Sequence, residues 1–327
     1  MSLGGFTPLY EGELGDLQVN EVALSPQGSL FAVVENSNTY IFDVYNHGNN
    51  STVTLPRTES LAFHPTKSEF CIALENELWI YSSENFEKQS IIALPHGVCS
   101  WPDLVTYSAN GQFIACASIS KVCVFKLNRN KYCSHSIHTI ESTLKGPLFV
   151  NGLCFNPTCT EIAVACDGQK MRVIDLRSKT VRGIPSVLKD AEFMYPNQSQ
   201  SHVLTLLKDG GLMRWNISDF SSEVIEAAGV TTCAFAMDSY VYCSQAVIYH
   251  SSGNRVELPA NITCLTMLDN NIVFAGTECG RIYKWDVDEN CIAEHYSGTS
   301  MHCEGLRITS DSRVIFIDET RVLMKDC

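Results

Sequence analysis

Short apolar runs separated by polar turn residues repeat along the whole chain. The clearest unit covers residues 262–287, where three runs rich in β-branched and aromatic residues are separated by Asp269-Asn270-Asn271 and by Gly280. Each run is four to seven residues long, which is too short for a helix and typical of a strand. Asn and Asp tolerate positive φ, and Gly adopts it without a Cβ clash, so both gaps predict tight turns. The unit therefore predicts a three-stranded antiparallel meander.

The unit occurs eight times along the chain. The residues that end the first run of each unit are Pro26, Pro65, Ala109, Pro157, Pro196, Asp238, Asp269 and Asp311. Their spacing of about forty residues is the period of a propeller blade. A more polar fourth run follows most units, as at 51–55 and 179–184, and polarity suits an outer edge strand.

One meander cannot cover its own hydrophobic faces, so the repeated units must stack. We expect an all-β chain that forms one β-propeller domain over residues 1–327, with eight four-stranded antiparallel blades. Seven blades are the alternative, if the short unit at 229–259 merges with a neighbour. The last unit ends after its third run, and an open edge there would be a liability. We therefore predict that residues 6–12 supply the outer strand of the C-terminal blade and close the ring.

Several short motifs resemble a divergent WD40-repeat β-propeller over essentially the whole chain. They are the Ser-Pro, Phe-His-Pro and Phe-Asn-Pro turns after first runs, the Asp167-Gly168 and Asp209-Gly210 turns, and Trp285-Asp286. The chain lacks a Gly-His dipeptide, and Trp-Asp occurs once. The hydrogen-bond network typical of that family is therefore expected to be absent from most blades, with apolar packing in its place.

Composition narrows the class of protein. Hydrophobic residues make up 45% of the chain and charged residues 18%, which excludes a disordered chain or a coiled coil. No apolar run approaches twenty residues, and residues 1–15 lack a secretory pattern, so we expect no membrane contact and a cytoplasmic or nuclear location. The fifteen cysteines are odd in number, form no Cys-x-x-Cys and lie mostly in apolar runs, which predicts reduced thiols.

Net charge limits the kinds of partner, and the missing motifs argue against catalysis and a metal site. The formal net charge of −13 argues against a direct nucleic-acid or anionic-membrane surface and favours a basic partner. Phosphate-loop, zinc-protease and nucleophile-elbow motifs are missing, so we expect no enzyme and no cofactor. Two clusters merit comparison with zinc sites: Cys133, His135 and His138; and Cys291, His295, His302 and Cys303. Zinc needs about four convergent ligands, and strand alternation separates the first set while the second is spread out, so no metal is expected.

The turns between second and third runs form the candidate partner-binding surface. Their acidic residues are Glu35, Glu75, Glu77, Asp167, Asp209, Glu278, Asp318 and Glu319. Because strand direction repeats from blade to blade, these turns share one face, which we call the acidic rim; its field could steer a basic peptide or domain. The alternative is ordinary turn chemistry in an acidic chain. Trp101 on the same face is a candidate interface anchor, or else packs between blades; the lesser candidates are His96, Phe149 and His302.

These observations favour a non-enzymatic protein–protein interaction scaffold, a subunit of a multiprotein complex that binds partner peptides or domains on the acidic rim. One alternative is the substrate receptor of a cullin-type ubiquitin ligase, because Ile174-Asp175-Leu176-Arg177 resembles the Trp-Asp-x-Arg ending of such receptors. A second is a nucleic-acid-recognition subunit of a larger complex, which would require a basic stripe hidden by the net charge. The paired arginines of phosphoinositide-binding propellers are absent.

Overall fold

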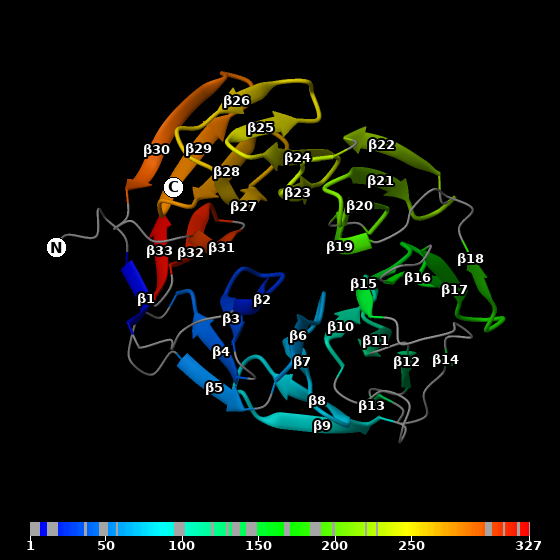
Figure 1. The fold of residues 1–327 in the computed structure, drawn as a ribbon. Helices are drawn as coiled ribbons and strands as arrows, with labels where there is room; N and C mark the ends of the chain where they lie inside the picture. The colour runs from blue at the N-terminus through cyan, green and yellow to red at the C-terminus, as the bar shows by residue number, and fades with distance from the viewer. Residues whose placement is uncertain are drawn as a thin grey trace.

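Eight antiparallel sheets follow one another around a ring in the computed structural model (Figure 1). The structure describes residues 7–11, 19–35, 38–45, 52–56, 58–94, 102–118, 121–128, 131–132, 138–141, 149–166, 171–183, 191–197, 200–219, 221–226, 228–297, 303–309, 311–318 and 321–326. Within these ranges every regular element is a strand. The predicted eight-bladed propeller is confirmed, and the seven-bladed alternative is wrong, because residues 229–259 fold as a blade of their own.

In each blade the first three strands follow one another in chain order from the centre outward. Blade 1 comprises β2 (Val19–Leu24), β3 (Leu30–Glu35), β4 (Asn38–Asp43) and β5 (Thr52–Pro56); blade 2 comprises β6 (Ser60–Phe63), β7 (Glu69–Ala73), β8 (Glu77–Ser82) and β9 (Lys88–Ala93). Blade 3 comprises β10 (Leu104–Tyr107), β11 (Phe113–Ser118), β12 (Lys121–Asn128) and β14 (His138–Glu141), with the two-residue β13 (Lys131–Tyr132) as a fifth strand beside β12. Blade 4 comprises β15 (Val150–Phe155), β16 (Glu161–Cys166), β17 (Arg172–Asp175) and β18 (Val181–Gly183).

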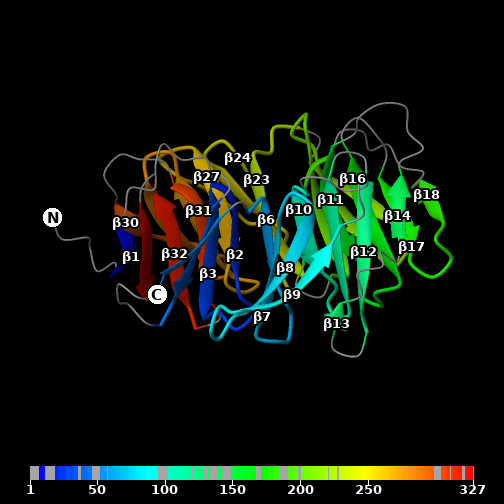
Figure 2. The same cartoon turned by 90° about the horizontal axis from the view of Figure 1, so that it is seen from below.

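The second half of the ring repeats this order. Blade 5 comprises β19 (Ala191–Pro196), β20 (His202–Leu207), β21 (Leu212–Asn216) and β22 (Ser222–Glu226); blade 6 comprises β23 (Thr232–Ala236), β24 (Ser239–Ser244), β25 (Val247–His250) and β26 (Arg255–Glu257). Blade 7 comprises β27 (Ile262–Met267), β28 (Ile272–Thr277), β29 (Arg281–Asp286) and β30 (Cys291–Ser297). Blade 8 comprises β31 (Cys303–Ile308), β32 (Arg313–Asp318), β33 (Arg321–Asp326) and β1 (Thr7–Glu11). From the side, the strands cross the thickness of the ring (Figure 2).

The two ends of the chain meet in blade 8, as predicted. Strand β1 pairs antiparallel with β33, so that Thr7 lies opposite Met324 and Glu11 opposite Arg321, with a bulge between Pro8 and Tyr10. This pairing covers the edge of β33 that would otherwise expose its backbone N–H and C=O groups. The ring is therefore closed by the N-terminal strand.

The core lies between blades and not within them. In β32, Val314 and Phe316 pack toward blade 7, whereas Ile315 and Ile317 pack toward blade 1. All four side chains are fully buried, because the second strand of a blade is covered on both faces. This double burial explains why second runs are nearly continuous apolar stretches in the sequence and do not alternate.

Buried polar side chains supplement the apolar packing that the sequence led us to expect. His64 Nε2 lies 3.2 Å from the carbonyl oxygen of Gly111 in the next blade. Asn197 Nδ2 donates to the Met237 carbonyl at 3.0 Å, and His250 Nε2 lies 2.8 Å from the Asn270 carbonyl. These bonds join blades 2 and 3, 5 and 6, and 6 and 7. In the part of the chain that the structure describes, no helix is long and apolar enough to cross a membrane.

Candidate functional site

The acids of the predicted rim are partly engaged in local bonds. Glu77 Oε2 accepts a hydrogen bond from Trp79 Nε1, and Glu278 Oε2 accepts one from Asn261 Nδ2 at 3.1 Å. Asp209 is exposed, and its carboxylate accepts the Gly211 N–H at 2.9 Å, which is ordinary Asx-turn chemistry. Glu75 is exposed on the same kind of turn. Glu77, Glu278 and Asp209 therefore have structural roles beside any role in binding.

The other predicted site residues cannot all be placed. Glu35 and Asp318 end β3 and β32, but their side chains are outside the described set. The residues that lie entirely outside the described ranges are Trp101, Asp167, Glu319, His96, His302, Cys133 and His135. Phe149 is described and is 50% exposed before β15. The acidic rim and its Trp101 anchor stay predictions.

The possible zinc ligands are not assembled among the described residues. Cys291 is exposed on an outer strand, whereas Cys303 is buried on an inner strand of the next blade. Over the described ranges, no three His, Cys, Asp or Glu side chains are arranged to hold a metal ion.

Blade 4 holds the residues on which the two alternative functions, nucleic-acid recognition and substrate reception for a ubiquitin ligase, depend. Its outer strands and their turn carry four cations, Arg172, Arg177, Lys179 and Arg182, in a chain of net charge −13. Arg182 Nη2 lies 2.8 Å from the Glu161 carboxylate, so part of this charge is neutralised.

The segment that resembles the ligase-receptor ending forms a polar turn. The Asp175 carboxylate accepts the Arg177 and Ser178 N–H groups, and these bonds lower its pKa, with the Ser178 bonds as the largest cause. Arg177 is exposed, and the exposed side chains that follow it, Ser178, Lys179 and Thr180, are polar. The turn itself therefore offers no apolar patch of the kind that the receptor hypothesis needs, and the nearest exposed apolar side chain along the chain is Val181 on β18, which is 40% exposed.

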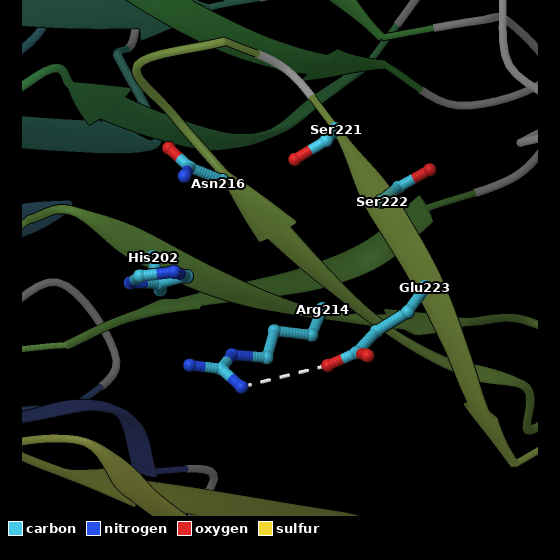
Figure 3. A pocket seen from close by; sticks show the side chains of 6 residues that line it. All are labelled: His202, Arg214, Asn216, Ser221, Ser222 and Glu223. Atoms are coloured by element: carbon cyan, nitrogen blue, oxygen red, sulfur yellow. Dashed lines mark hydrogen bonds and ion pairs between the residues drawn. The ribbon is translucent and has the colours of Figure 1, made fainter.

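A surface at the junction of blades 5 and 6 is the feature that sequence reasoning missed. Its polar end is a shallow cavity of about 280 Å³ on blade 5. The residues that line it are His202, Arg214, Asn216, Ser221, Ser222 and Glu223 (Figure 3). Arg214 Nη1 lies 3.5 Å from Glu223 Oε1, and the Arg214 guanidinium also lies 5.8 Å from the ring centroid of Tyr240 in blade 6. All six residues that line the cavity belong to blade 5, and Arg214 connects it to Tyr240. We call the cavity, together with the adjoining face of blade 6, the blade 5–6 cleft.

The blade 6 wall of this cleft is aromatic. Phe235 and Tyr240 are cross-strand partners with ring centroids 6.1 Å apart, and Tyr242 stacks on its partner Tyr249 at 5.0 Å. Tyr240 and Tyr242 lie two positions apart on β24 and therefore on the same face. These four rings lie on one face of blade 6, and we call them the aromatic wall.

The aromatic wall is incompletely covered by blade 5. Among the described residues, the apolar cluster between these blades has five buried members: Leu204, Leu206, Leu212, Val230 and Cys233. The side chains of Phe235, Tyr240 and Tyr242 pack against this cluster but are only partly buried. By contrast, the cluster between blades 6 and 7 encloses Tyr283 and Trp285, which are 5% and 1% exposed. The blade 5–6 junction thus leaves aromatic surface accessible where the next junction buries it.

Electrostatics of the cleft favour a cation. Burial, together with the Arg214 charge, lowers the pKa of His202, so its imidazole is neutral at pH 7. Four carboxylates lie close enough to influence the charge of the described cleft residues. Asp219, Glu223 and Asp238 act on His202, and Glu226 acts on Tyr242. The guanidinium of Arg214 opposes them. The Arg214 Nε, although buried, has no hydrogen-bond partner within the described ranges. The cleft is therefore a net acidic, aromatic surface with a polar end.

Comparison with solved structures identifies the class of fold. The chain is similar to the crystal structure of Sqt1 from Saccharomyces cerevisiae, a WD40 protein, with a TM-score of 0.74 over 99% of both chains and 10% sequence identity. The chain therefore has the fold of a WD40-type β-propeller. Because 1688 chains of solved structures match, this likeness defines the architecture and selects no particular partner. Neither a protein-family model nor a curated protein sequence matches the chain.

Proposed function

We propose that this propeller is a non-enzymatic interaction module, a subunit of a cytoplasmic or nuclear hetero-complex, and that its blade 5–6 cleft binds a basic segment of a partner protein. The fold supports the general role, since propellers of this kind are typically interaction scaffolds. The observation that carries the specific proposal is the partly exposed aromatic wall of blade 6 beside four carboxylates.

The chemistry of the cleft suggests how such a segment would bind. A Lys or Arg side chain over the face of Tyr240 or Tyr242 gains a cation–π interaction of about 0.5–2 kcal/mol. Carboxylates nearby, such as Glu226 and Asp238, stabilise the same charge. An apolar neighbour in the partner can cover Met237, which is 56% exposed beside the cleft. Because the blades are rigid, little ordering entropy is lost on the protein side.

The acidic rim remains a second candidate surface in this proposal. It lies on the turns between second and third strands, whereas the polar cavity lies where β20 begins and β21 ends. These two sets of positions are at opposite ends of the strands. The polar cavity and the rim can therefore be altered independently, whereas Glu226, which pairs with Leu212 next to the Asp209 turn, lies at the rim end of the cleft.

Selection of displayed peptides separates the two surfaces. A random 12-residue peptide library is selected on the immobilised full chain, and enriched peptides are measured by fluorescence polarisation. We expect a consensus with at least one Lys or Arg and an aromatic or aliphatic residue. Tyr240→Ala should weaken binding about tenfold. Asp238→Lys, at the cavity end of the cleft, should weaken it more, with the larger effect at low salt.

Two controls complete the design. Tyr45 is 45% exposed on blade 1 and also has a guanidinium, that of Arg313, 4.6 Å over its ring. Tyr45→Ala should leave binding unchanged. The rim variant Glu75→Lys, Asp209→Lys, Glu278→Lys should also bind normally; loss of binding in this variant alone would transfer the site to the rim. Failure to enrich any peptide would refute the interaction module itself.

A further inference from the structure

Two cysteines from adjacent blades have their sulfur atoms in contact. Cys264 lies on β27 of blade 7 and Cys303 begins β31 of blade 8, and their Sγ atoms are 3.3 Å apart. Cys303 is buried, whereas Cys264 is half-buried on a strand that lines the centre of the ring (Figure 1). Thr263 Oγ1 donates to the Cys303 carbonyl at 2.7 Å and fixes the two strands beside the pair. The two thiols are therefore held together by the packing of blade against blade.

A glycine makes the space for both sulfur atoms. Gly276 of β28 is the cross-strand partner of Cys264. A Cβ at this position would lie 2.5 Å from Cys303 Sγ and 2.6 Å from Cys264 Sγ. Gly276 has ordinary strand geometry, so its backbone does not require glycine. Glycine is needed at this position because a Cβ atom would collide with the two sulfur atoms.

The surroundings also activate one of the two thiols. The pKa of Cys264 is lowered, first by its hydrogen bond with Cys303, then by those with the Thr263 hydroxyl and the Gly276 backbone, with a smaller contribution from the Arg307 charge. These effects outweigh burial, which raises the pKa of Cys154 to about 12. Arg307 is itself fixed, with its Nη1 donating to the Leu306 carbonyl and its Nη2 to the Val22 carbonyl. The thiolate is the nucleophilic form of cysteine, and the lowered pKa of Cys264 increases its population.

We propose that Cys264 and Cys303 form a reversible redox modification site, at which a peroxide converts the two thiols into a disulfide that joins blades 7 and 8. In the first step the Cys264 thiolate attacks one peroxide oxygen, an S–O bond forms, the O–O bond breaks, and the leaving hydroxide takes a proton to become water. In the second step the Cys303 sulfur attacks the sulfenic acid, an S–S bond forms, and the hydroxyl leaves as water with the Cys303 proton. Two cysteines lose two electrons, and one peroxide becomes two waters.

The disulfide has a measurable consequence for the fold. It links residues 39 positions apart across a blade junction that the Thr263–Cys303 hydrogen bond and apolar packing also hold. Cross-links of this loop length restrict the unfolded chain. The oxidised protein should therefore melt higher than the reduced protein, by on the order of 5 °C. A dithiol reductant should reverse the shift.

Mass spectrometry tests the linkage on the full chain. Trypsin releases Cys264 within residues 256–281 and Cys303 within 285–307, and these peptides also contain the exposed Cys279 and Cys291. The Cys279→Ser, Cys291→Ser variant leaves one cysteine in each peptide. After brief hydrogen peroxide treatment, alkylation and non-reducing digestion, we expect the linked pair of peptides. Cys116 and Cys123, which face each other across β11 and β12 and are fully buried, serve as the internal control and should stay alkylatable after unfolding.

Single substitutions test the order of the steps. In the same background, Cys303→Ser should leave a sulfenic acid on Cys264 that dimedone traps, whereas Cys264→Ser should give neither the linkage nor a dimedone adduct on Cys303. Both are small isosteric changes, and the melting temperature of the reduced variants checks that they fold. Full alkylation of both cysteines after peroxide treatment of the folded background variant, or linkage no faster than at Cys116 and Cys123, would overturn the proposal.

Discussion

The buried histidine between blades 2 and 3 gives the sharpest test of how this ring is held together. His64 is 1% exposed, and its Nδ1 accepts the N–H groups of Thr66 at 3.1 Å and Lys67 at 2.9 Å. Because Nδ1 is an acceptor, the proton is on Nε2, which donates to the Gly111 carbonyl in blade 3. The ring also meets Tyr107 edge-on, with centroids 5.0 Å apart. One neutral imidazole thus closes a turn and joins two blades.

The expected cost of His64→Ala follows from these contacts. Leaving the buried Gly111 carbonyl without its donor costs about 1–3 kcal/mol. Loss of the edge contact with Tyr107 costs about 0.5–1.5 kcal/mol. The two turn N–H groups can bond to water, since Lys67 is exposed, and contribute less. We therefore expect the free energy of unfolding to fall by about 3 kcal/mol.

Urea denaturation followed by tryptophan fluorescence measures this loss. His202→Ala is the matched control, because the His202 ring is half-buried in the blade 5–6 cleft and bonds to Ser201 of its own blade. That variant should lose less than about 1 kcal/mol. A loss below about 1 kcal/mol for His64→Ala, or equal losses for both variants, would refute the idea that this imidazole joins the blades.

Three further predictions follow from the same structure. Burial lowers the pKa values of His64 and His250 below 6.5, so the unfolded chain binds protons that the native chain does not. The free energy of unfolding should therefore fall as the pH drops below about 6.5. In a His64→Ala, His250→Ala variant the urea midpoint should depend less on pH. Leu9→Asp puts a charge against the apolar cluster of blades 8 and 1 and should cost about 2 kcal/mol in thermal denaturation, whereas Val224→Asp, at a position 65% exposed on an outer strand, should cost almost nothing. Gly210→Ala, at φ +78° with the new Cβ 2.6 Å from Gly229 N, should cost about 2 kcal/mol, and Gly183→Ala, with open space around it, less than about 0.5 kcal/mol by the same measurement.

The sequence by itself determined the architecture. Strands that pair with their chain neighbours through short turns are encoded locally, so the spacing of apolar runs and of turn residues such as Asp269 and Gly280 was enough to count eight blades. Ring closure could also be predicted from the sequence, because the last unit lacked a fourth run and the residues before Val19 could provide the fourth strand of blade 8. The small fifth strand β13 carried no signal, since two residues show no periodicity.

Only the tertiary structure decided which side chains meet between blades. His64 and Gly111 are 47 positions apart, and Cys264 and Cys303 are 39 apart. Their contacts depend on how the turns and inner strands of consecutive blades are offset when the sheets stack. Arg214 and Tyr240 meet for the same reason. The alternation of Tyr240 and Tyr242 was visible in the sequence, but their exposure was not, because coverage of one blade is set by the volume of side chains on its neighbour.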